Sequence, residues 1–482
     1  MDRFAKIVCT LGPSSNTKEI IQSLVTAGMN VARLNFSHGT HEDHGKKIDL
    51  IREISDEMGV PLTILQDLQG PKLRIGKLPQ GIITLKAGDE VTLSSSEDFV
   101  TDEKDIFIPF EVPDLHKAVK PGNHILLDDG QIEMEVQSIT GDRIEAVVTL
   151  GGDLKSNKGV NLPGASLTFP SFTEKDKADL EFGLSKHVDM VAISFVKTAQ
   201  DVITVRDAIF ELAPDPAGRK TPIIAKLERP EAMENLDEIM AVTDGVMVAR
   251  GDLGVEMSPA GVPIAQKEII ACANAHARLV ITATQMLDSM INNPRPTRAE
   301  ATDVANAVFD GTDAVMLSGE TAAGKYPLES VQMMDAIVRK AEANSQRWGK
   351  PILESELEDD SDAVSITRAA KALAEDRNVV AIIVFTESGK TARLMSKARP
   401  GVPILAFTPE LPTYHQMGLF WGVTPLLVPH ADTLETMLKH VETAIAATTD
   451  LQAGQQVIVI SGFPVGAMRQ PNLALLHTLG EV

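Results

Sequence analysis

The sequence predicts an α/β protein built on a (β/α)8 TIM barrel, with an inserted small β-barrel lid domain and a C-terminal α/β domain. Three features of the 482-residue chain lead to this prediction. Short apolar runs that end in polar or glycine-rich corners recur through most of residues 1–320. One long β-like stretch interrupts their rhythm, and a second α/β pattern begins after an acidic segment near residue 360.

Eight apolar runs are the predicted barrel strands, because each is rich in Val, Ile or Leu on both faces, as in a buried parallel sheet. They are Ile7–Cys9, Val31–Phe36, Leu62–Gln66, Val188–Ile193, Ile223–Ala225, Val246–Ala249, Val280–Ala283 and Val315–Leu317. Helix-like stretches with start and stop signals separate most of them, such as Ile20–Ala27 between Thr17 and Gly28. An open doubly wound sheet is the alternative, but polar corners after so many different strands favour the barrel.

The interruption predicts an all-β domain at residues 71–168, inserted between barrel segments 1–70 and 169–344. Its expected strands are Glu90–Leu93, Ile106–Phe110, Ile125–Leu127, Glu133–Val136 and Ile144–Leu150. Turn signals such as Asp128-Asp129-Gly130 and Gly141-Asp142 separate these strands. A small β-barrel over the mouth of a catalytic barrel is a candidate lid.

A helix near Pro327–Asn344 is expected to close the barrel, and the acidic residues 345–362 connect it to a third domain, 345–482. That domain has a fresh α/β pattern. Its expected elements are a helix at Ser365–Glu375, a strand at Val379–Phe385, a helix ending at Lys397, strands at Val402–Phe407 and Leu426–Pro429, a helix at Leu434–Ala447 and a strand at Val457–Ser461.

Composition excludes several classes of protein. The net charge is −22, from 67 acidic and 45 basic side chains, which argues against nucleic-acid binding because that needs a basic face. The longest apolar run, Val379–Phe385, is far shorter than the ~18 residues that span a membrane, and the N-terminus lacks a signal-peptide core. Two cysteines, Cys9 and Cys272, form neither a disulfide framework nor a four-ligand zinc site. We expect a cytoplasmic protein with no membrane partner.

Polar side chains share one face at the ends of two predicted strands. Arg33, Asn35 and Ser37 alternate along one strand and therefore point the same way, and Asp67 ends the next strand. An arginine, a carboxylate and two neutral oxygen donors suit a phosphate and a cation. A polar barrel rim without function is the alternative.

A second pair of strand ends repeats this pattern. Lys226 and Glu228 share a face, and Asp252 follows the next strand. The two carboxylates are hard ligands suited to Mg²⁺, and Lys226 would stabilise negative charge on a phosphoryl group or an enolate. Structural ion pairs are the alternative. Taken together, the two clusters favour a catalytic site over both alternatives.

Three further features are less specific. Thr284 places a hydroxyl at the barrel mouth, where it binds a substrate oxygen, relays a proton or merely caps a helix. A polar loop joins a strand to a helix in the last domain and resembles a phosphate site, although it lacks the Walker spacing. This loop is Thr386, Glu387, Ser388, Gly389, Lys390 and Thr391. His38, His41 and His44 are expected to face solvent rather than bind zinc, with His38 able to reach a nucleotide.

Six stretches of sequence together resemble the pyruvate kinase family, and the resemblance covers essentially the whole chain. They are Lys6–Pro13 (KIVCTLGP), Ala32–Gly39 (ARLNFSHG), Ser156–Gly164 (SNKGVNLPG), Ala249–Glu256 (ARGDLGVE), Ala283–Met290 (ATQMLDSM) and Met316–Ala322 (MLSGETA). The resemblance implies transfer of a phosphoryl group from phosphoenolpyruvate to ADP, giving pyruvate and ATP with Mg²⁺ or Mn²⁺. It is the last step of glycolysis.

The resemblance also implies roles for individual residues. Glu228 and Asp252 would hold the Mg²⁺, and Lys226 would neutralise charge on the phosphoryl group and the enolate. Arg33 and Arg74 would clamp phosphates. The substrate carboxylate would meet Gly251, Asp252 and Thr284, with Thr284 helping to protonate the enolate through water. The nucleotide side is implied to comprise Asn35, His38, Arg74 and Lys158.

One departure from the family pattern concerns K⁺. Many relatives carry a glutamate where this chain has Lys72, and those relatives require K⁺. We expect Lys72 to supply that positive charge, so that K⁺ is dispensable although the monovalent-cation site is retained. The residues implied for that site are Asn35, Ser37, Asp67 and Leu68. A surface lysine at the hinge of the lid is the alternative.

The last domain resembles the family's regulatory domain, which implies that Thr386–Thr391 binds a phosphorylated allosteric effector and that the chain forms a homotetramer. Two competing functions remain open on the sequence alone. One is a divalent-metal barrel lyase or aldolase that acts through an enolate, and the other is a non-catalytic metabolite sensor. The lyase would need neither Arg74 nor Lys158, and the sensor would not need Lys226.

Overall fold

The computed structural model describes residues 3–71, 73–95, 106–110, 115–128, 130–164, 170–213, 221–345, 361–377, 379–465 and 469–481. Eight parallel strands close into a barrel in the order β1-β16-β15-β14-β13-β12-β3-β2. The strands are β1 (Lys6–Thr10), β2 (Val31–Asn35), β3 (Thr63–Asp67), β12 (Met190–Ile193), β13 (Ile223–Leu227), β14 (Gly245–Ala249), β15 (Leu279–Ala283) and β16 (Ala314–Leu317). Each contains part of one predicted apolar run, so the predicted barrel is confirmed.

Helices return the chain from the carboxyl end of each barrel strand to the amino end of the next. They are α1 (Lys18–Ala27), α2 (His41–Met58), α4 (Glu174–Ser185), α5 (Ala199–Leu212), α6 (Pro230–Glu234), α7 (Leu236–Val242), α8 (Arg250–Met257), α9 (Val262–Ala275), α10 (Arg298–Asp310), α11 (Gly319–Ala322) and α12 (Pro327–Glu342), with 3-10 turns η1 (Pro13–Ser15) and η2 (Asp288–Ile291). Their apolar faces and the strands enclose one large buried core. Thr17 caps α1, as the sequence predicts.

The inserted segment is all-β apart from the short helix α3 (Leu115–Ala118). Its strands are β4 (Ile82–Leu85), β5 (Glu90–Ser94), β6 (Ile106–Pro109), β7 (His124–Leu127), β8 (Ile132–Thr140), β9 (Arg143–Leu150), β10 (Gly152–Lys155) and β11 (Val160–Asn161). Among described residues they form a six-stranded sheet, β11-β7-β8-β9-β5-β6, and a two-stranded sheet, β10-β4. We call this part the β module; it has its own apolar core.

The C-terminal domain is an α/β sheet in the order β19-β18-β17-β20-β21, parallel except for the β20–β21 pair. Its elements are α14 (Asp362–Arg377), β17 (Ala381–Phe385), α15 (Lys390–Lys397), β18 (Ile404–Thr408), α16 (Leu411–Gln416), η4 (Met417–Leu419), β19 (Val423–Leu427), α17 (Leu434–Thr448), β20 (Gln456–Ser461) and β21 (Leu473–Thr478). The strand predicted at Leu426–Pro429 begins three residues earlier, because β19 is an edge strand and tolerates Pro425 inside it.

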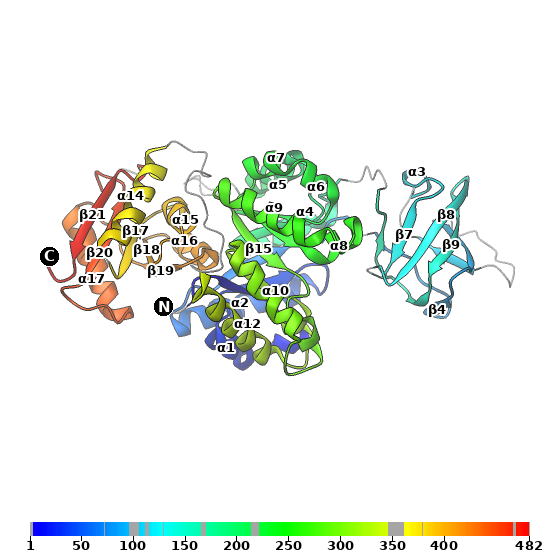
Figure 1. Ribbon diagram of the computed structural model, residues 1–482, viewed down its shortest axis with the longest axis horizontal. Coiled ribbons are helices and arrows are strands. Elements are labelled where there is room, and N and C mark those ends of the chain that lie inside the picture. Colours follow the sequence, from blue (N-terminus) through cyan, green and yellow to red (C-terminus); the bar gives the residue numbers. More distant parts are fainter. Residues whose placement is uncertain are drawn as a thin grey trace.

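The three parts lie in a row, with the barrel between the C-terminal domain and the β module (Figure 1). The C-terminal domain contacts the amino ends of the barrel strands. Lys6 Nζ in β1 donates a hydrogen bond to the Val423 carbonyl oxygen at 2.8 Å, and Thr63 Oγ in β3 donates one to the His415 carbonyl oxygen at 2.6 Å. One buried apolar cluster runs from the barrel interior into the C-terminal sheet. In the described part of the chain, no helix is long and apolar enough to span a bilayer.

Candidate active site

A row of charged side chains in mutual contact lies at the carboxyl ends of β2, β3 and β13. Arg33 Nε donates to Asp67 Oδ2 at 2.6 Å, and Arg33 Nη1 donates to Thr10 Oγ at 2.8 Å. Asn35 pairs with Asp67 in the register of β2 against β3, so the two strand ends are level. Asp67 is almost wholly buried, which makes this a desolvated ion pair rather than a surface one.

Lys226 joins the first cluster to the second. Its ammonium lies 3.2 Å from Asp67 Oδ1 and 2.9 Å from Glu228 Oε1, and it donates to Ser194 Oγ at 2.8 Å. The three N–H bonds of the ammonium therefore each have a partner. Ser194 follows β12 and donates to the Leu68 carbonyl oxygen at 2.8 Å. The residues that the sequence assigned to two separate strand pairs thus form one network.

Burial and charge shift the pKa values of this network in opposite directions. Burial raises the pKa of Glu228 to about 7, and nearby Asp252 adds to that rise while Lys226 opposes it. Burial also acts to raise the pKa of Asp67, but Lys226 and Arg33 outweigh it and hold that pKa below its ordinary value. Burial acts to lower the pKa of Lys226, yet Asp67 and Glu228 raise it overall. Lys226 is therefore a permanent cation.

Asp252 lies in the first turn of α8, next to Gly251, and its charge acts on both Lys226 and Glu228. Thr284 follows β15 and has a left-handed backbone, with φ of 73°. The guanidinium of Arg250 braces this turn, since Nη2 donates to the Thr284 carbonyl oxygen at 2.7 Å. A Cβ added at Gly251 would lie 2.7 Å from Thr284 Cγ2, so only glycine allows this close approach.

The donor set of Glu228 and Asp252 fits a magnesium ion. Both side chains offer carboxylate oxygens, which Mg²⁺ prefers, and Mg²⁺ commonly takes one or two of them with substrate oxygens and water. Repulsion from Asp252 adds to the burial that raises the pKa of Glu228, and a dication between the two carboxylates would relieve that repulsion. One Glu228 oxygen, Oε2, accepts a hydrogen bond from the Phe195 backbone N–H at 2.8 Å, which orients the carboxylate.

The four residues assigned to a monovalent-cation site lie on two neighbouring strand ends, and three of them already have partners. Asp67 pairs with Arg33 and Lys226, the Leu68 carbonyl accepts from Ser194, and Asn35 Oδ1 accepts from the Ser37 N–H at 3.1 Å. Lys72 lies outside the described residues, and its predicted role stays a prediction.

Arg74 and Lys158 belong to the β module and are brought together by an antiparallel bridge between Arg74 and Gly159. Arg74 Nη1 donates to the Asn157 carbonyl oxygen at 2.9 Å, and Lys158 Nζ lies 2.8 Å from Asp128 Oδ1. These are contacts within the β module. In the described ranges, no hydrogen bond or ion pair joins either side chain to the barrel network.

The three histidines after β2 do not all face solvent, so the prediction is wrong in part. His38 is exposed, but His44 is only 4% exposed and stacks on Phe36 at 4.0 Å. Its Nε2 donates to the His38 carbonyl oxygen at 2.8 Å. His44 lies on the inner face of α2, where its ring packs as an aromatic side chain.

A cleft of about 940 Å³ lies between the β module and α8. His124 and Glu133 line it from the β module, and Asp252 and Thr284 line it from the barrel. The β module also contacts α8 directly, because Asn161 Nδ2 donates to Glu256 Oε1 at 3.0 Å. The cleft thus lies beside Asp252 and Thr284, two of the residues that the sequence assigns to the substrate carboxylate.

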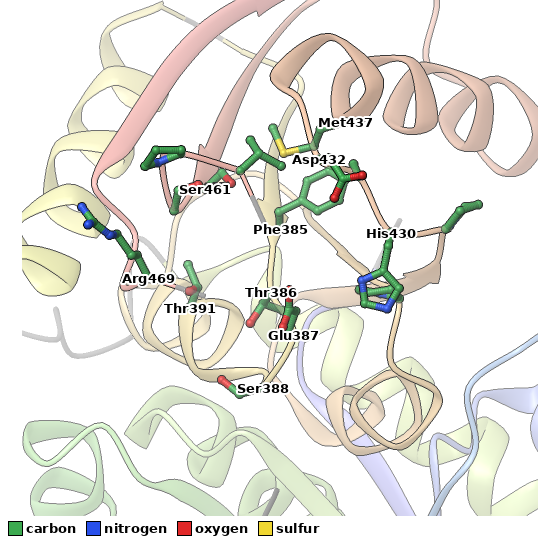
Figure 2. Close-up of a pocket in the computed structure, with 16 residues that line it drawn as sticks. Phe385, Thr386, Glu387, Ser388, Thr391, His430, Asp432, Met437, Ser461 and Arg469 are labelled. Carbon is green, nitrogen blue, oxygen red and sulfur yellow. Dashed lines mark hydrogen bonds between the residues drawn. The ribbon is translucent and has the colours of Figure 1, made fainter. Parts of the chain in front are cut away.

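A second pocket, of about 400 Å³, lies at the carboxyl edge of the C-terminal sheet (Figure 2). Thr386, Glu387, Ser388 and Thr391 of the predicted loop line it, whereas Gly389 and Lys390 do not. Gly389, with φ of 78°, donates its N–H to Thr386 Oγ at 3.0 Å and starts α15. The other residues that line this pocket include His430, Asp432, Ser461 and Arg469.

Sequence reasoning missed several residues of both sites. Thr10 and Ser194 stand at or just after strand ends, and the rule applied to Asp67 would have found them. Arg469 and His430 come from loops far along the chain from Thr386, so only the order of the sheet brings them to one pocket. The Phe195 N–H leaves no trace in a side-chain pattern.

Comparisons with known proteins agree with this architecture. The family model described as pyruvate kinase, barrel domain, matches residues 2–331, and the one described as pyruvate kinase, alpha/beta domain, matches residues 364–477. Pyruvate kinases of Staphylococcus saprophyticus and Staphylococcus aureus are 44% and 43% identical over 484 residues, which cover 99% of this chain and 81% of theirs. A crystal structure of a pyruvate kinase from Cryptosporidium parvum has a TM-score of 0.91 at 35% identity, covering 99% of this chain and 96% of that one.

Proposed function

The chain belongs to the pyruvate kinase family, a family of phosphotransferases, and from this premise we propose how its residues transfer a phosphoryl group from phosphoenolpyruvate to ADP. One observation carries the proposal. Arg33, Asp67, Lys226 and Glu228 form a continuous buried charge network at the carboxyl ends of the barrel strands. Phosphoryl transfer needs positioning and charge neutralisation more than covalent work by side chains. Neither a lyase nor a non-catalytic sensor is favoured by the relatives of this chain.

Lys226 and Arg33 neutralise the transferred group. Both cations sit on fixed partners at the strand ends, so they need little reorganisation when negative charge develops on the phosphoryl oxygens. Lys226 also stabilises the enolate that remains when the phosphoryl group leaves. Because its pKa is raised, it acts as a charge and not as a proton donor.

Glu228 and Asp252 would hold the divalent ion, Mg²⁺ or Mn²⁺. The ion, when bound, supplies positive charge to the phosphoryl and carboxylate oxygens of the substrate. The first turn of α8 presents Asp252 together with Gly251, whose missing side chain lets Thr284 lie close to this turn, so that the three residues can meet the substrate carboxylate. The Thr284 hydroxyl then directs a water that protonates the enolate carbon, while Arg250 keeps its turn in place.

Nucleotide binding falls to Asn35, His38, Arg74 and Lys158. Support comes from the adjacency of Arg74 and Lys158 in the β module and from the cleft between that module and α8. We place the limits of this lid at residues 71–168, of the barrel at 1–70 and 169–344, and of the C-terminal domain at 345–482. Closure of the lid over the cleft would carry both basic side chains toward the phosphates of ADP and exclude water.

The test is the initial rate of pyruvate formation from phosphoenolpyruvate, ADP and Mg²⁺ by the full chain. Glu228→Gln and Asp252→Asn should each raise the Mg²⁺ concentration needed for half-maximal rate by about tenfold or more, because a neutral amide is a poor ligand for a hard dication. Glu234→Gln, an exposed residue of α6, is the matched control. Wild-type Mg²⁺ dependence in both variants would refute the assignment.

Dispensability of K⁺ is tested in the same assay. We propose that Lys72 supplies the positive charge that many relatives take from K⁺, so rates with and without KCl should be equal in a buffer whose only monovalent cation is bulky and organic, at matched ionic strength. Lys72→Glu should then make the rate depend on K⁺. A wild-type rate that requires K⁺ would overturn the proposal while leaving the kinase activity intact.

Regulation belongs to the C-terminal pocket, which we propose binds a phosphorylated effector through Thr386–Thr391. Hydroxyls and backbone N–H groups at the start of α15 suit a phosphate, and Arg469 adds a positive charge. Sugar phosphates and nucleotides at equal concentration should be compared for activation, with Ser388→Asp as the blocking variant.

We further propose that the protein forms a homotetramer, to be checked by sedimentation. The cytoplasm is its expected location, and both cysteines are free thiols.

A further inference from the structure

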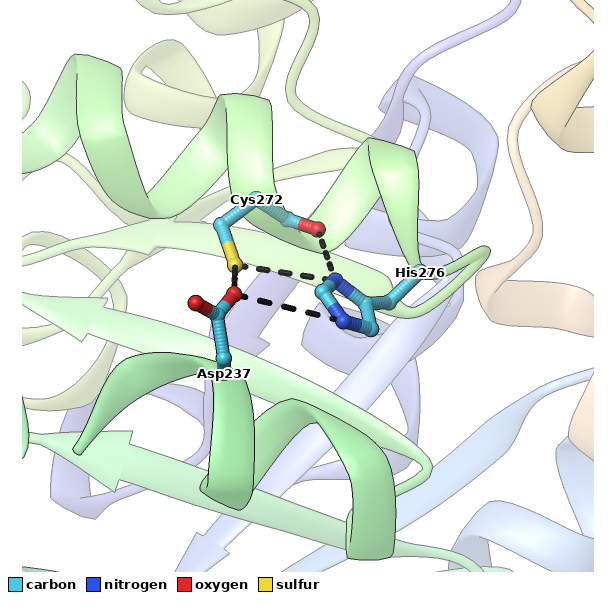
Figure 3. Close-up of side chains that lie close together, drawn as sticks. All are labelled: Asp237, Cys272 and His276. Carbon is cyan, nitrogen blue, oxygen red and sulfur yellow. Dashed lines mark hydrogen bonds and ion pairs between the residues drawn. The ribbon is translucent and has the colours of Figure 1, made fainter. Parts of the chain in front are cut away.

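We propose a second metal site, for a zinc ion, formed by Asp237, Cys272 and His276 on the outside of the barrel. The three side chains converge between α7 and α9, which pack against each other (Figure 3). Cys272 and His276 are four residues apart and therefore lie on one face of α9 and its C-cap, while Asp237 comes from the first turn of α7. Thiolate, imidazole and carboxylate are the three ligand types that proteins use for zinc.

The distances suit a tetrahedral ion. Cys272 Sγ lies 3.3 Å from Asp237 Oδ1, His276 Nε2 lies 4.0 Å from the same oxygen, and the ligand atoms all lie within 4.8 Å of one another. With metal–ligand bonds of about 2.0–2.3 Å, ligand atoms on a tetrahedral zinc are roughly 3.3–3.7 Å apart. Small side-chain rotations would complete the site. The Asp237 side chain is 86% exposed, so water can take the fourth position.

The imidazole of His276 is already oriented for such a role. Its Nδ1 lies 3.0 Å from the Cys272 carbonyl oxygen, and because a carbonyl only accepts, the proton must be on Nδ1. Nε2 then carries a lone pair, and it faces Asp237. A backbone carbonyl that fixes the tautomer of a ligating histidine is the usual supporting contact at zinc sites.

The chemistry of this cluster separates it from the catalytic site. Glu228 and Asp252 present only carboxylate oxygens, which suit Mg²⁺, whereas a thiolate with an imidazole selects zinc over Mg²⁺. The two sites also lie at opposite ends of the barrel, because α9 runs from the carboxyl end of β14 to the amino end of β15. Without metal, the Cys272 thiol donates a hydrogen bond to Asp237 Oδ1 at 3.3 Å, and zinc binding would release that thiol proton to solvent and put the ion in its place.

The cluster adjoins the contact between the barrel and the C-terminal domain. Asn274, between the two α9 ligands in sequence, accepts a hydrogen bond from Lys397 Nζ of α15 at 2.8 Å. A zinc ion bridging α7 and α9 would hold the end of α9 that makes this contact. Because it binds the folded state alone, zinc would also raise the midpoint of thermal unfolding.

Cobalt provides the direct test, because Co²⁺ adopts zinc geometry and its bond to a thiolate gives a charge-transfer band in the near ultraviolet. The full chain is freed of metal with a chelator, saturated with Mg²⁺ to fill the catalytic site, and titrated with Co²⁺. We expect one equivalent to produce the thiolate band and tetrahedral ligand-field bands, and zinc to displace it. Cys272→Ser should abolish the thiolate band.

Asp237→Asn and His276→Gln should each weaken zinc binding by about tenfold or more in competition with a chromogenic chelator. Glu238→Gln, an exposed carboxylate on the same turn of α7, should leave the affinity unchanged. All these variants should keep wild-type turnover with Mg²⁺, which also shows that they are folded. The absence of a thiolate band in the wild type, its persistence in Cys272→Ser, or unchanged zinc affinity in both ligand variants would overturn the proposal.

Discussion

At the scale of single residues, Lys226 is the central cation of the buried charge network. Its ammonium forms ion pairs with both Asp67 and Glu228, and it also donates to Ser194. Lys226→Met should lower kcat by about 10²–10³ or more, because it removes a fixed charge from the transition state and leaves two buried carboxylates facing each other. Steady-state kinetics with a circular-dichroism check of folding measures this effect.

Lys226→Arg is the informative comparison. It keeps the charge, but a planar guanidinium cannot place three donors where an ammonium does, so kcat should be intermediate. A wild-type kcat in Lys226→Met would show that the transferred group is neutralised elsewhere.

Gly251 makes a steric prediction that can be reversed by a second change. Gly251→Ala places a Cβ 2.7 Å from Thr284 Cγ2, which must displace either α8 or the Thr284 turn. We expect kcat/KM for phosphoenolpyruvate to fall by about tenfold or more, since misplacing a substrate-positioning group is costly. Thr284→Ser keeps the hydroxyl and removes Cγ2, so the double variant should recover much of the loss. Equal defects in the single and double variants would contradict the steric explanation.

Much of the candidate site could be predicted from the sequence because alternate residues at strand ends share a face. Arg33, Asp67, Lys226 and Glu228 are found this way, and direct contacts join them in the structure. Ser194 is a single hydroxyl with no pattern around it, and the Phe195 N–H belongs to the backbone. For His44 the prediction of solvent exposure is wrong, because histidine is a polar residue type whereas its ring here stacks on Phe36 in the buried core.

At the scale of elements, α15 connects two distant places. Its second residue, Thr391, lines the C-terminal pocket, and its last residue, Lys397, is fully buried against Asp313 at the amino end of the barrel. Removing one partner of a buried ion pair leaves the other charge uncompensated. In Lys397→Met, Arg399 still pairs with Asp313 at 2.6 Å, so the loss is smaller than for a carboxylate left with no cation. The free energy of unfolding should fall by about 1–3 kcal/mol at pH 7, measured by urea denaturation. Lys390→Met, exposed at the other end of α15, is the matched control, and equal midpoints for the two variants would refute the prediction.

Elements with a strong apolar period could be predicted, whereas short edge elements could not. The eight barrel strands are largely buried on both faces, so each contains a short apolar run even where a side chain such as Arg33 or Lys226 interrupts it. By contrast, β10 and β11 contain few residues, and β21 pairs only along one edge, so their patterns are weak. The predicted start of β19 is too late because of Pro425: a proline in the sequence argues against a strand unless the strand lies at the edge of a sheet.

At the scale of the whole molecule, the contact between the C-terminal domain and the barrel could not be predicted from the sequence. Lysines are normally exposed, and nothing around Lys6 or Lys397 marks them as buried. In the structure, both lie in the contact between the barrel and the C-terminal domain, where they bond across it to Val423 and Asp313. Docking therefore depends on buried lysines, a residue type that the sequence alone would place at the surface.

This docking makes the stability of the molecule depend on pH in a definite direction. Burial lowers the pKa of Lys6 from 10.5 to about 7, with Arg3 adding to the effect and Glu342 opposing it. Between those two values the unfolded chain holds a proton on Lys6 that the folded chain has released. The unfolded state therefore binds more protons, and stability rises with pH by up to about 1.4 kcal/mol per pH unit across this window. Below pH 7 the cost of burying the charge is complete.

Lys6→Met removes the titrating group and should remove that dependence. The neutral amine of Lys6 still donates to the Val423 carbonyl, so the wild type keeps its hydrogen bond at pH 9 and is also free of the buried charge. The free energy of unfolding of the wild type minus that of the variant should then increase from pH 7 to pH 9, measured by denaturation at pH 7, 8 and 9. Lys77→Met, an exposed change in the β module, should follow the wild-type profile throughout. Parallel curves for the wild type and Lys6→Met would mean that Lys6 stays charged in the folded protein, held by Glu342, and that the interface tolerates the cation.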